Sequence, residues 1–165
     1  MKPRRLLTHR SNIGVGNYHF FMGDQPGILG RIDIATSEVC YLQVPVQVTF
    51  DGGERKFSWQ DFTSGDQTGS GFLVEGDKRR LSHGFGHISA ATPIVINNHI
   101  YFSTVLGTVY VIDATRDSFD RDSLVAVNDL GVPGKTWTLS PFTAANGRLY
   151  QRTSRELICI EAKSE

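Results

Sequence analysis

The 165-residue chain is of single-domain size, and its 39% hydrophobic and 21% charged residues are typical of a soluble globular protein. Lys plus Arg equals Asp plus Glu at 17 each, so there is no basic surplus of the kind that draws proteins to nucleic acid or anionic lipid. No apolar run approaches the roughly 18 residues of a spanning helix, and Leu6-Leu7 is too short for the apolar core of a signal peptide. These features argue against a membrane span, an export signal and nucleic-acid binding, and they leave the compartment open.

Residues 11–50 contain short apolar runs separated by turn signals at Gly16-Asn17 and at 23–27. The further run 39–48 includes Pro45, which cannot donate a backbone hydrogen bond to a neighbouring strand. The pattern predicts short antiparallel strands, with 39–48 as an outer edge strand.

Residues 51–88 break this pattern. They are rich in Gly, Ser, Asp and charge, and only KFSW (56–59) and GFLV (71–74) have the composition of strands. We interpret the segment as an insertion, which in compact folds is either a functional loop or poorly ordered.

Residues 89–138 give the clearest β pattern in the chain. Asn97-Asn98 predicts a tight hairpin, because Asn tolerates left-handed backbone, and Leu106-Gly107 predicts another turn. The run TVYVI is unbroken and apolar, as expected for a strand covered on both faces. The predicted strands are 94–96, 99–103, 108–112 and 124–127, with a charged loop before the last.

Residues 139–165 repeat this pattern in shorter form. Asn146-Gly147 is the strongest hairpin signal in the protein, and 149–152 and 157–160 are the predicted second and third strands. No pattern for a fourth strand follows, so we expect this unit to be incomplete.

The last two units are copies of one motif. Pro93 and Pro141 are 48 residues apart, as are Ala114 and Ala162, and a fixed period in this range is the mark of a solenoid or propeller. A third, more diverged copy lies in the first unit, where Asn17 and Asp33 match Asn98 and Asp113 at offsets of 81 and 80.

We therefore predict an all-β chain that forms one partial β-propeller domain over residues 1–165. It has about three antiparallel blades, and it is open rather than a closed ring, because propellers typically have four to eight blades. The expected parts are a first blade at 11–50, the insertion at 51–88, a second blade at 89–138 and an incomplete third blade at 139–165.

The repeated order of Pro, apolar run, Asn-containing turn, Tyr, turn, apolar run, acidic residue and Ala resembles the repeat of the pyrroloquinoline-quinone-like (PQQ-like) β-propeller superfamily. The matching residues are Pro93, Asn98, Tyr101, Gly107, Asp113 and Ala114, and again Pro141, Asn146, Gly147, Tyr150, Glu161 and Ala162. The strings GTVYVIDA, NDLG, GKTW, ANGRLY and ELICIE look like the C-terminal end of large bacterial PQQ-like repeat proteins. The resemblance covers most of the chain outside 51–88 and implies a fragment, or a short product, of a longer propeller protein.

This superfamily includes quinoprotein alcohol dehydrogenases and a non-enzymatic outer-membrane assembly lipoprotein, so the fold selects no function. Quinoproteins share a blade-linking motif ending in Thr-Gly-Lys and Trp, and an adjacent cysteine pair near the quinone. The corresponding stretches here read DATRDSFDRDSL and DIATSEVCYL, and Cys40 and Cys159 are not adjacent. We therefore expect no quinone or other cofactor, no metal and no catalytic residue in this chain, and we lean against an enzyme. The resemblance implies the cell envelope or periplasm for a parent protein.

Two groups of side chains suggest a metal. His83 and His87 are close enough in sequence to share one, but their Gly-rich stretch fixes no geometry and no nearby ligand completes a set. Asp117, Asp120 and Asp122 suggest calcium, but their spacing is not that of an EF-hand. Solvated loop residues are the favoured interpretation of both groups.

Other candidates are better explained by structure. Gly14-Val15-Gly16 and Gly69-Ser70-Gly71 do not extend to a dinucleotide or phosphate loop and are interpreted as turn glycines. Cys40 and Cys159 lie in apolar runs, where we expect small hydrophobes rather than a disulfide or a nucleophile.

The aromatic residues give a similar choice. Trp59 and Trp137 are candidate platforms for a sugar or peptide, but large aromatics in propellers more often pack between blades. Tyr101 and Tyr150 occupy matched positions of the repeat, which indicates packing.

Three hypotheses of function follow. The first is a non-catalytic propeller segment with a structural or protein-interaction role, with 51–87 as its variable surface. Its partner is a protein or the missing remainder of the propeller, and its exposed blade faces promote self-association. The second is the C-terminal part of a quinoprotein-type dehydrogenase whose quinone and calcium ligands lie outside this chain. The third is a carbohydrate-binding surface that uses Trp59 or Trp137.

Overall fold

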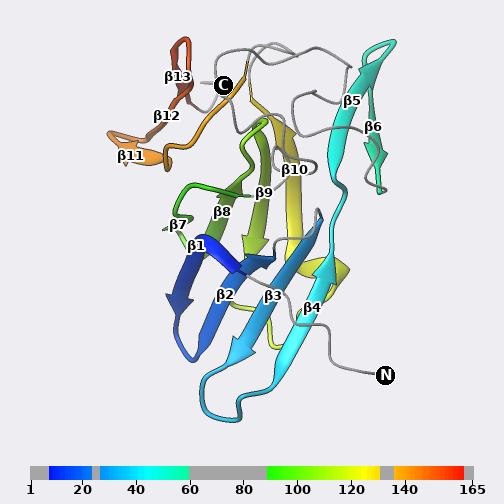
Figure 1. Cartoon of the computed structure of the whole chain (residues 1–165), viewed down its shortest axis with the longest axis vertical. Coiled ribbons are helices and arrows are strands. Elements are labelled where there is room, and N and C mark those ends of the chain that lie inside the picture. Colours follow the sequence, from blue (N-terminus) through cyan, green and yellow to red (C-terminus); the bar gives the residue numbers. More distant parts are fainter. Residues whose placement is uncertain (1–7, 24–26, 60–88, 131–135, 162–165) are drawn as a thin grey trace.

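The computed structural model describes residues 8–23, 27–59, 89–130 and 136–161, and its strands form four antiparallel sheets (Figure 1). In each sheet, strands that follow one another in sequence are hydrogen-bonded neighbours. The first sheet contains β1 (Thr8–Val15), β2 (Tyr18–Gly23), β3 (Ile28–Asp33) and β4 (Val39–Gln43). A hairpin of β5 (Gln47–Asp51) and β6 (Glu54–Ser58) follows it.

The second sheet contains β7 (Ile94–Ile96), β8 (His99–Ser103), β9 (Thr108–Asp113) and β10 (Leu124–Asp129), with a short 3-10 helix, η3 (Arg121–Ser123), before its last strand. The third sheet contains β11 (Thr143–Ala145), β12 (Arg148–Arg152) and β13 (Leu157–Ile160). These meander sheets close into no ring among the described residues. The fold is therefore a nearly all-β, partial and open propeller, as the sequence predicts.

The tight hairpins form where the Asn-containing turns predict them. Asn97 and Asn98 have φ values of 47° and 64°, and Asn146 and Gly147 have 51° and 74°. Two consecutive residues with positive φ give a type I′ turn, whose twist matches that of antiparallel strands.

The repeat also has matched hydrogen bonds where each third strand ends. The carbonyl of Asn17 accepts from the backbone N–H of Ile34 at 2.9 Å, and the carbonyl of Asn98 accepts from that of Ala114 at 2.9 Å. Asp33 and Asp113 each accept a hydrogen bond from the backbone N–H two residues later. The Asn and Asp of the motif therefore shape the turn and the end of the strand.

The second sheet is buried on both faces, which explains the unbroken TVYVI run. Its residues facing the first sheet are Ile100, Phe102, Tyr110 and Ile112, and these pack in one core with Phe20, Met22, Leu29 and Leu42. Its residues facing the third sheet are Tyr101, Val109 and Val111, and these pack with Phe142, Leu149 and Ile158. The alternation of side chains along β8 and β9 thus supplies two cores.

The expected single edge strand 39–48 is wrong. β4 ends at Gln43, and the chain leaves the first sheet there to enter β5, which pairs with β6 and runs beside β10 (Figure 1). Pro45 lies in the connection, where its carbonyl accepts a hydrogen bond from the buried Tyr110 hydroxyl at 2.7 Å. That contact fixes the chain between the sheets, so the proline ends one strand instead of lying within it.

Two further boundaries differ from expectation. β1 begins at Thr8, before the expected start at residue 11, and β6 places Glu54–Ser58 in a strand within the expected insertion. β6 includes most of KFSW, whereas GFLV lies outside the described residues. No helix in the described part of the chain has the length and apolar character needed to cross a membrane.

Candidate functional site: a groove beside the third sheet

The third sheet has one strand fewer than the first and second. β4 and β10 are the fourth strands of those sheets, and they pair with β3 and β9. Among the described residues β13, the third strand of its sheet, pairs only with β12. One backbone edge of β13 is therefore without a strand partner in this part of the chain, and such edges are templates for pairing with another strand.

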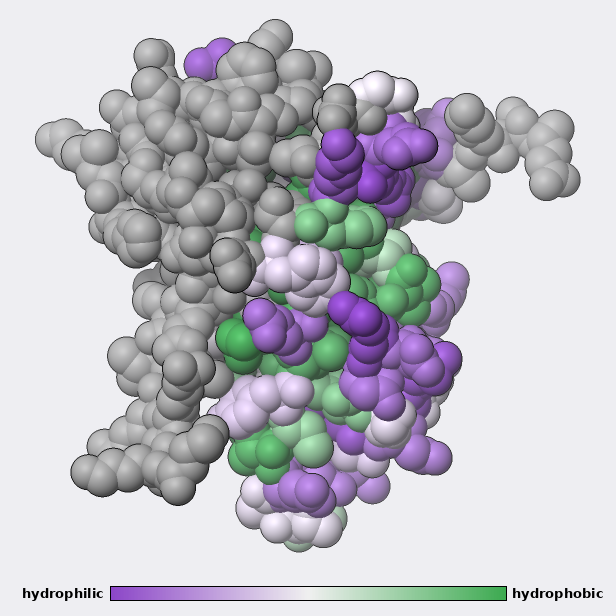
Figure 2. All heavy atoms as spheres, turned by 90° about the vertical axis from the view of Figure 1, so that its right-hand side faces the viewer, coloured by the Kyte–Doolittle hydropathy of each residue, from purple (hydrophilic) through white to green (hydrophobic). Residues whose placement is uncertain are grey.

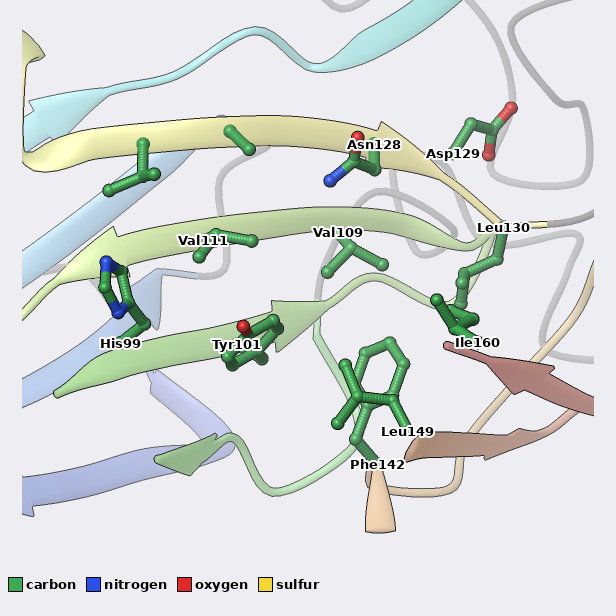
Figure 3. A pocket seen from close by; sticks show the side chains of 12 residues that line it. His99, Tyr101, Val109, Val111, Asn128, Asp129, Leu130, Phe142, Leu149 and Ile160 are labelled. Atoms are coloured by element: carbon green, nitrogen blue, oxygen red, sulfur yellow. The ribbon is translucent and has the colours of Figure 1, made fainter. Parts of the chain in front are cut away.

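A groove of about 570 Å³ lies between the second and third sheets beside this edge (Figure 3). Most of its side chains are apolar. The lining residues are His99, Tyr101, Val109, Val111, Val125, Ala126, Asn128, Asp129, Leu130, Phe142, Leu149 and Ile160.

Strand register explains why these residues meet. Ala126 and Asn128 of β10 lie opposite Val111 and Val109 of β9, on the face turned toward the third sheet. In the third sheet, Leu149 of β12 pairs with Ile160 of β13, and Ile160 is 39% exposed. The groove is thus bounded by the face that β10 would offer to a fourth strand of the third sheet.

The polar groups at the groove are few. Asn128 projects from β10 near Val109, and the Tyr101 hydroxyl lies near the two valines of β9 (Figure 3). The His99 ring is within 2.9 Å of the Asn97 carbonyl, with Nδ1 the contacting atom. Such a lining suits apolar side chains together with one or two hydrogen bonds.

Asp129 lies at the end of the groove. It is opposite Thr108 in the register, so its side chain is on the other face of β10 from Asn128, and Figure 3 shows its carboxylate beyond the apolar lining. Burial raises the pKa of Asp129 to about 7, and a hydrogen bond from the Leu130 backbone opposes this only in part. The carboxyl group therefore changes charge near neutral pH.

A smaller hollow of about 310 Å³ separates the β5–β6 hairpin from η3 and β10. Trp59 lies there under the guanidinium of Arg121, which is 4.9 Å from the ring centroid. Trp137 is in a different place: it is only 4% exposed and packs with Val105 and Leu106. The structure therefore brings Trp59, but not Trp137, to a hollow.

The aspartates of the charged loop are used in local contacts. The carboxylate of Asp120 caps η3 by accepting from the backbone N–H of Asp122 at 3.0 Å. Hydrogen bonding, first from the side chain of Ser118 and then from Asp122, lowers the pKa of Asp120. Asp122 is 4.0 Å from Arg116. The described residues hold no group of three potential metal ligands, this loop included.

The remaining sequence candidates are spread over the fold. Cys40 is half-buried against the first core, Cys159 is exposed on β13, and both are free thiols. Tyr101 packs edge to face on Phe142 with centroids 6.2 Å apart, whereas the matched Tyr150 is partly exposed.

Gly14-Val15-Gly16 ends β1 and begins its turn, in which Gly16 has a φ of 56°. His83, His87 and Gly69-Ser70-Gly71 lie outside the described residues.

Sequence reasoning did not identify the groove residues. The available signal was the lack of a fourth-strand pattern after Ile160, which indicates an open edge. Which side chains face that edge depends on the pairing of β9 with β10 and on the position of the third sheet. Neither is visible from a period of 48 residues.

No family model and no curated protein matches the sequence. Among solved structures, the computationally designed Ika4 protein is 11% identical with a TM-score of 0.40, and the match covers 99% of this chain and 96% of that chain. The computationally designed Ika8 protein is 10% identical with a TM-score of 0.36, covering 93% of this chain and 45% of the other. BamB from Moraxella catarrhalis is 14% identical with a TM-score of 0.33, covering 90% and 41%. The chain thus spans less than half the length of Ika8 and of BamB.

Proposed function

We propose that this chain is a non-catalytic propeller segment with a structural or protein-interaction role, completed by another polypeptide such as the remaining blades of a longer PQQ-like repeat protein. The observation that carries the proposal is the third sheet, whose open edge lies along an apolar groove. Apolar surfaces with a few polar groups are typical of the buried centres of protein interfaces.

The outer faces of the end sheets support the same role. Val39 and Tyr41 lie on the first sheet, on the face away from the second sheet, and are 42% and 50% exposed. Leu157 lies on the third sheet and is 67% exposed. Figure 2 shows apolar side chains at the surface among hydrophilic ones on one side of the molecule. Covering a side chain of this size contributes about 1.5–3 kcal/mol, so another blade on either face would stabilise the chain.

Light scattering after size exclusion tests this proposal on the full chain. We expect concentration-dependent dimers or higher oligomers, because the end faces are apolar and exposed. Tyr41→Lys and Leu157→Lys should shift the distribution toward monomer with little change in melting temperature, since both positions are exposed. A cooperatively melting monomer at every concentration counts against the proposal.

A further inference from the structure

We propose that the groove and the free edge of β13 bind an extended strand of another polypeptide, antiparallel to β13, with aliphatic side chains pointing into the groove. The inference rests on the proposed function and names the kind of partner that this site takes. Strand addition of this type gains affinity from main-chain hydrogen bonds and specificity from pockets for alternate side chains.

The second sheet provides a template for the added strand. β10 pairs antiparallel with β9, and Val127 lies opposite Tyr110 while Leu124 lies opposite Ile112. Both side chains point toward the first sheet, where Val127 is buried and Leu124 packs against the same core. A fourth strand therefore covers the preceding sheet with alternate aliphatic side chains.

The same arrangement can be transferred by one blade. Ile158 and Ile160 of β13 occupy the places that Tyr110 and Ile112 have in β9, because the two strands are related by the repeat of 48 residues. A strand added to β13 would place one side chain opposite Ile158 and another opposite Ile160. Both would point toward the second sheet, where the groove lies.

The groove is suited to such side chains. Ala126 leaves room on β10, and Val125, which is 55% exposed, provides an apolar rim. β13 has four residues, which extend over about 13 Å at roughly 3.3 Å per residue. A short extended segment is enough to occupy the edge, and the backbone of that segment would satisfy the unpaired groups of β13.

The chain's own fourth strand is a suitable probe. A labelled peptide with the sequence of residues 122–129, DSLVAVND, carries the aliphatic spacing that fits the template. We expect it to bind the full chain in fluorescence anisotropy, measured at protein concentrations below those of self-association. The same peptide with Leu124→Asp and Val127→Asp should bind at least tenfold more weakly.

Two variants of the protein localise the binding. Ile160→Lys places a charge in the groove, and Leu157→Lys is its matched control on the same strand, exposed and outside the groove lining. We expect at least a tenfold loss of affinity for Ile160→Lys and less than a twofold change for Leu157→Lys. Val125→Lys provides a second groove variant, and circular dichroism identifies any variant that fails to fold.

Hydrogen exchange separates strand addition from nonspecific apolar contact. Peptide binding should slow the exchange of backbone amides on the open edge of β13, and N-methylation of alternate peptide nitrogens should abolish it. Absence of binding at millimolar peptide, or binding that Ile160→Lys and Val125→Lys leave unchanged, overturns the inference. Oligomers that persist in light scattering would still support the proposed function in that case.

Discussion

Arg31 and Asp117 join the first two sheets although they are 86 residues apart. The Arg31 guanidinium donates to the Asp117 carbonyl from Nη2 at 2.6 Å and to the neighbouring Arg116 carbonyl from Nη1 at 2.8 Å. It also lies over the ring of Tyr18, 4.1 Å from the centroid. A buried Arg on the inner face of β3 thus holds the loop between β9 and β10 in place.

Arg31→Lys should lower the free energy of unfolding by about 1–3 kcal/mol, because one ammonium cannot serve two carbonyls in the geometry of a guanidinium. Urea denaturation measures this change. Arg116→Ala is the control, since its exposed side chain is no closer than 3.8 Å to a carboxylate and its carbonyl is retained. Equal losses for the two variants would show that the clamp has no special role.

Gly30 gives a second prediction, because it lies between Phe21 and Tyr41 in a row across three strands. A Cβ atom at this position would be 2.1 Å from Cζ of Phe21. Gly30→Ala should therefore destabilise the protein by about 1–3 kcal/mol through overpacking.

A smaller residue at position 21 tests the cause. Phe21→Leu should reduce the cost of Gly30→Ala, and a double-mutant cycle gives the coupling energy. Gly14→Ala is the matched control in β1, where a Cβ atom meets nothing within 4 Å. Additive effects at positions 21 and 30 would contradict the proposed clash.

The parts of the fold that the sequence predicts correctly depend on local chemistry. Asn146-Gly147 specifies its hairpin because both residues accept positive φ, and TVYVI indicates a strand covered on both faces without reference to distant residues. The repeat then orders the sheets. For these elements, local preference and the final fold agree.

The remaining features depend on contacts between distant residues. Pro45 ends a strand because the Tyr110 hydroxyl reaches its carbonyl, and this pair is separated by 65 residues. Arg31 has the charge of a surface residue, yet it is buried, since its partners are carbonyls from another blade. The groove likewise requires the placement of two sheets, which periodicity alone does not provide.

Asp129 predicts a pH dependence of stability. Its pKa is raised to about 7 in the folded chain, above the value near 4 of an unfolded chain, so the folded state binds more protons between these values. Stability should fall as pH rises from about 4 to 7 and change little through this group above that. Asp129→Asn should remove this fall and stabilise the protein at pH 8 by about 1–3 kcal/mol.

Urea denaturation at pH 5 and at pH 8 measures the effect of Asp129→Asn. Asp122→Asn is the control, because its side chain is 78% exposed on the loop before β10. If both variants keep the pH profile of the unmodified protein, Asp129 is not the source of the dependence.

Tyr110 predicts a dependence at alkaline pH. Burial raises the pKa of Tyr110 well above its usual range near 10, and its hydroxyl donates to the Pro45 carbonyl. Tyr110→Phe should cost about 1–2 kcal/mol at pH 7, because that carbonyl loses its partner. Above pH 10 the unfolded chain releases the Tyr110 proton while the folded chain retains it, so the unmodified protein loses stability and the variant does not. The difference between them should therefore shrink from pH 7 to pH 11 in denaturation experiments. Tyr41→Phe, at a half-exposed position, should show no such convergence, and a constant gap for Tyr110→Phe would contradict the pKa shift.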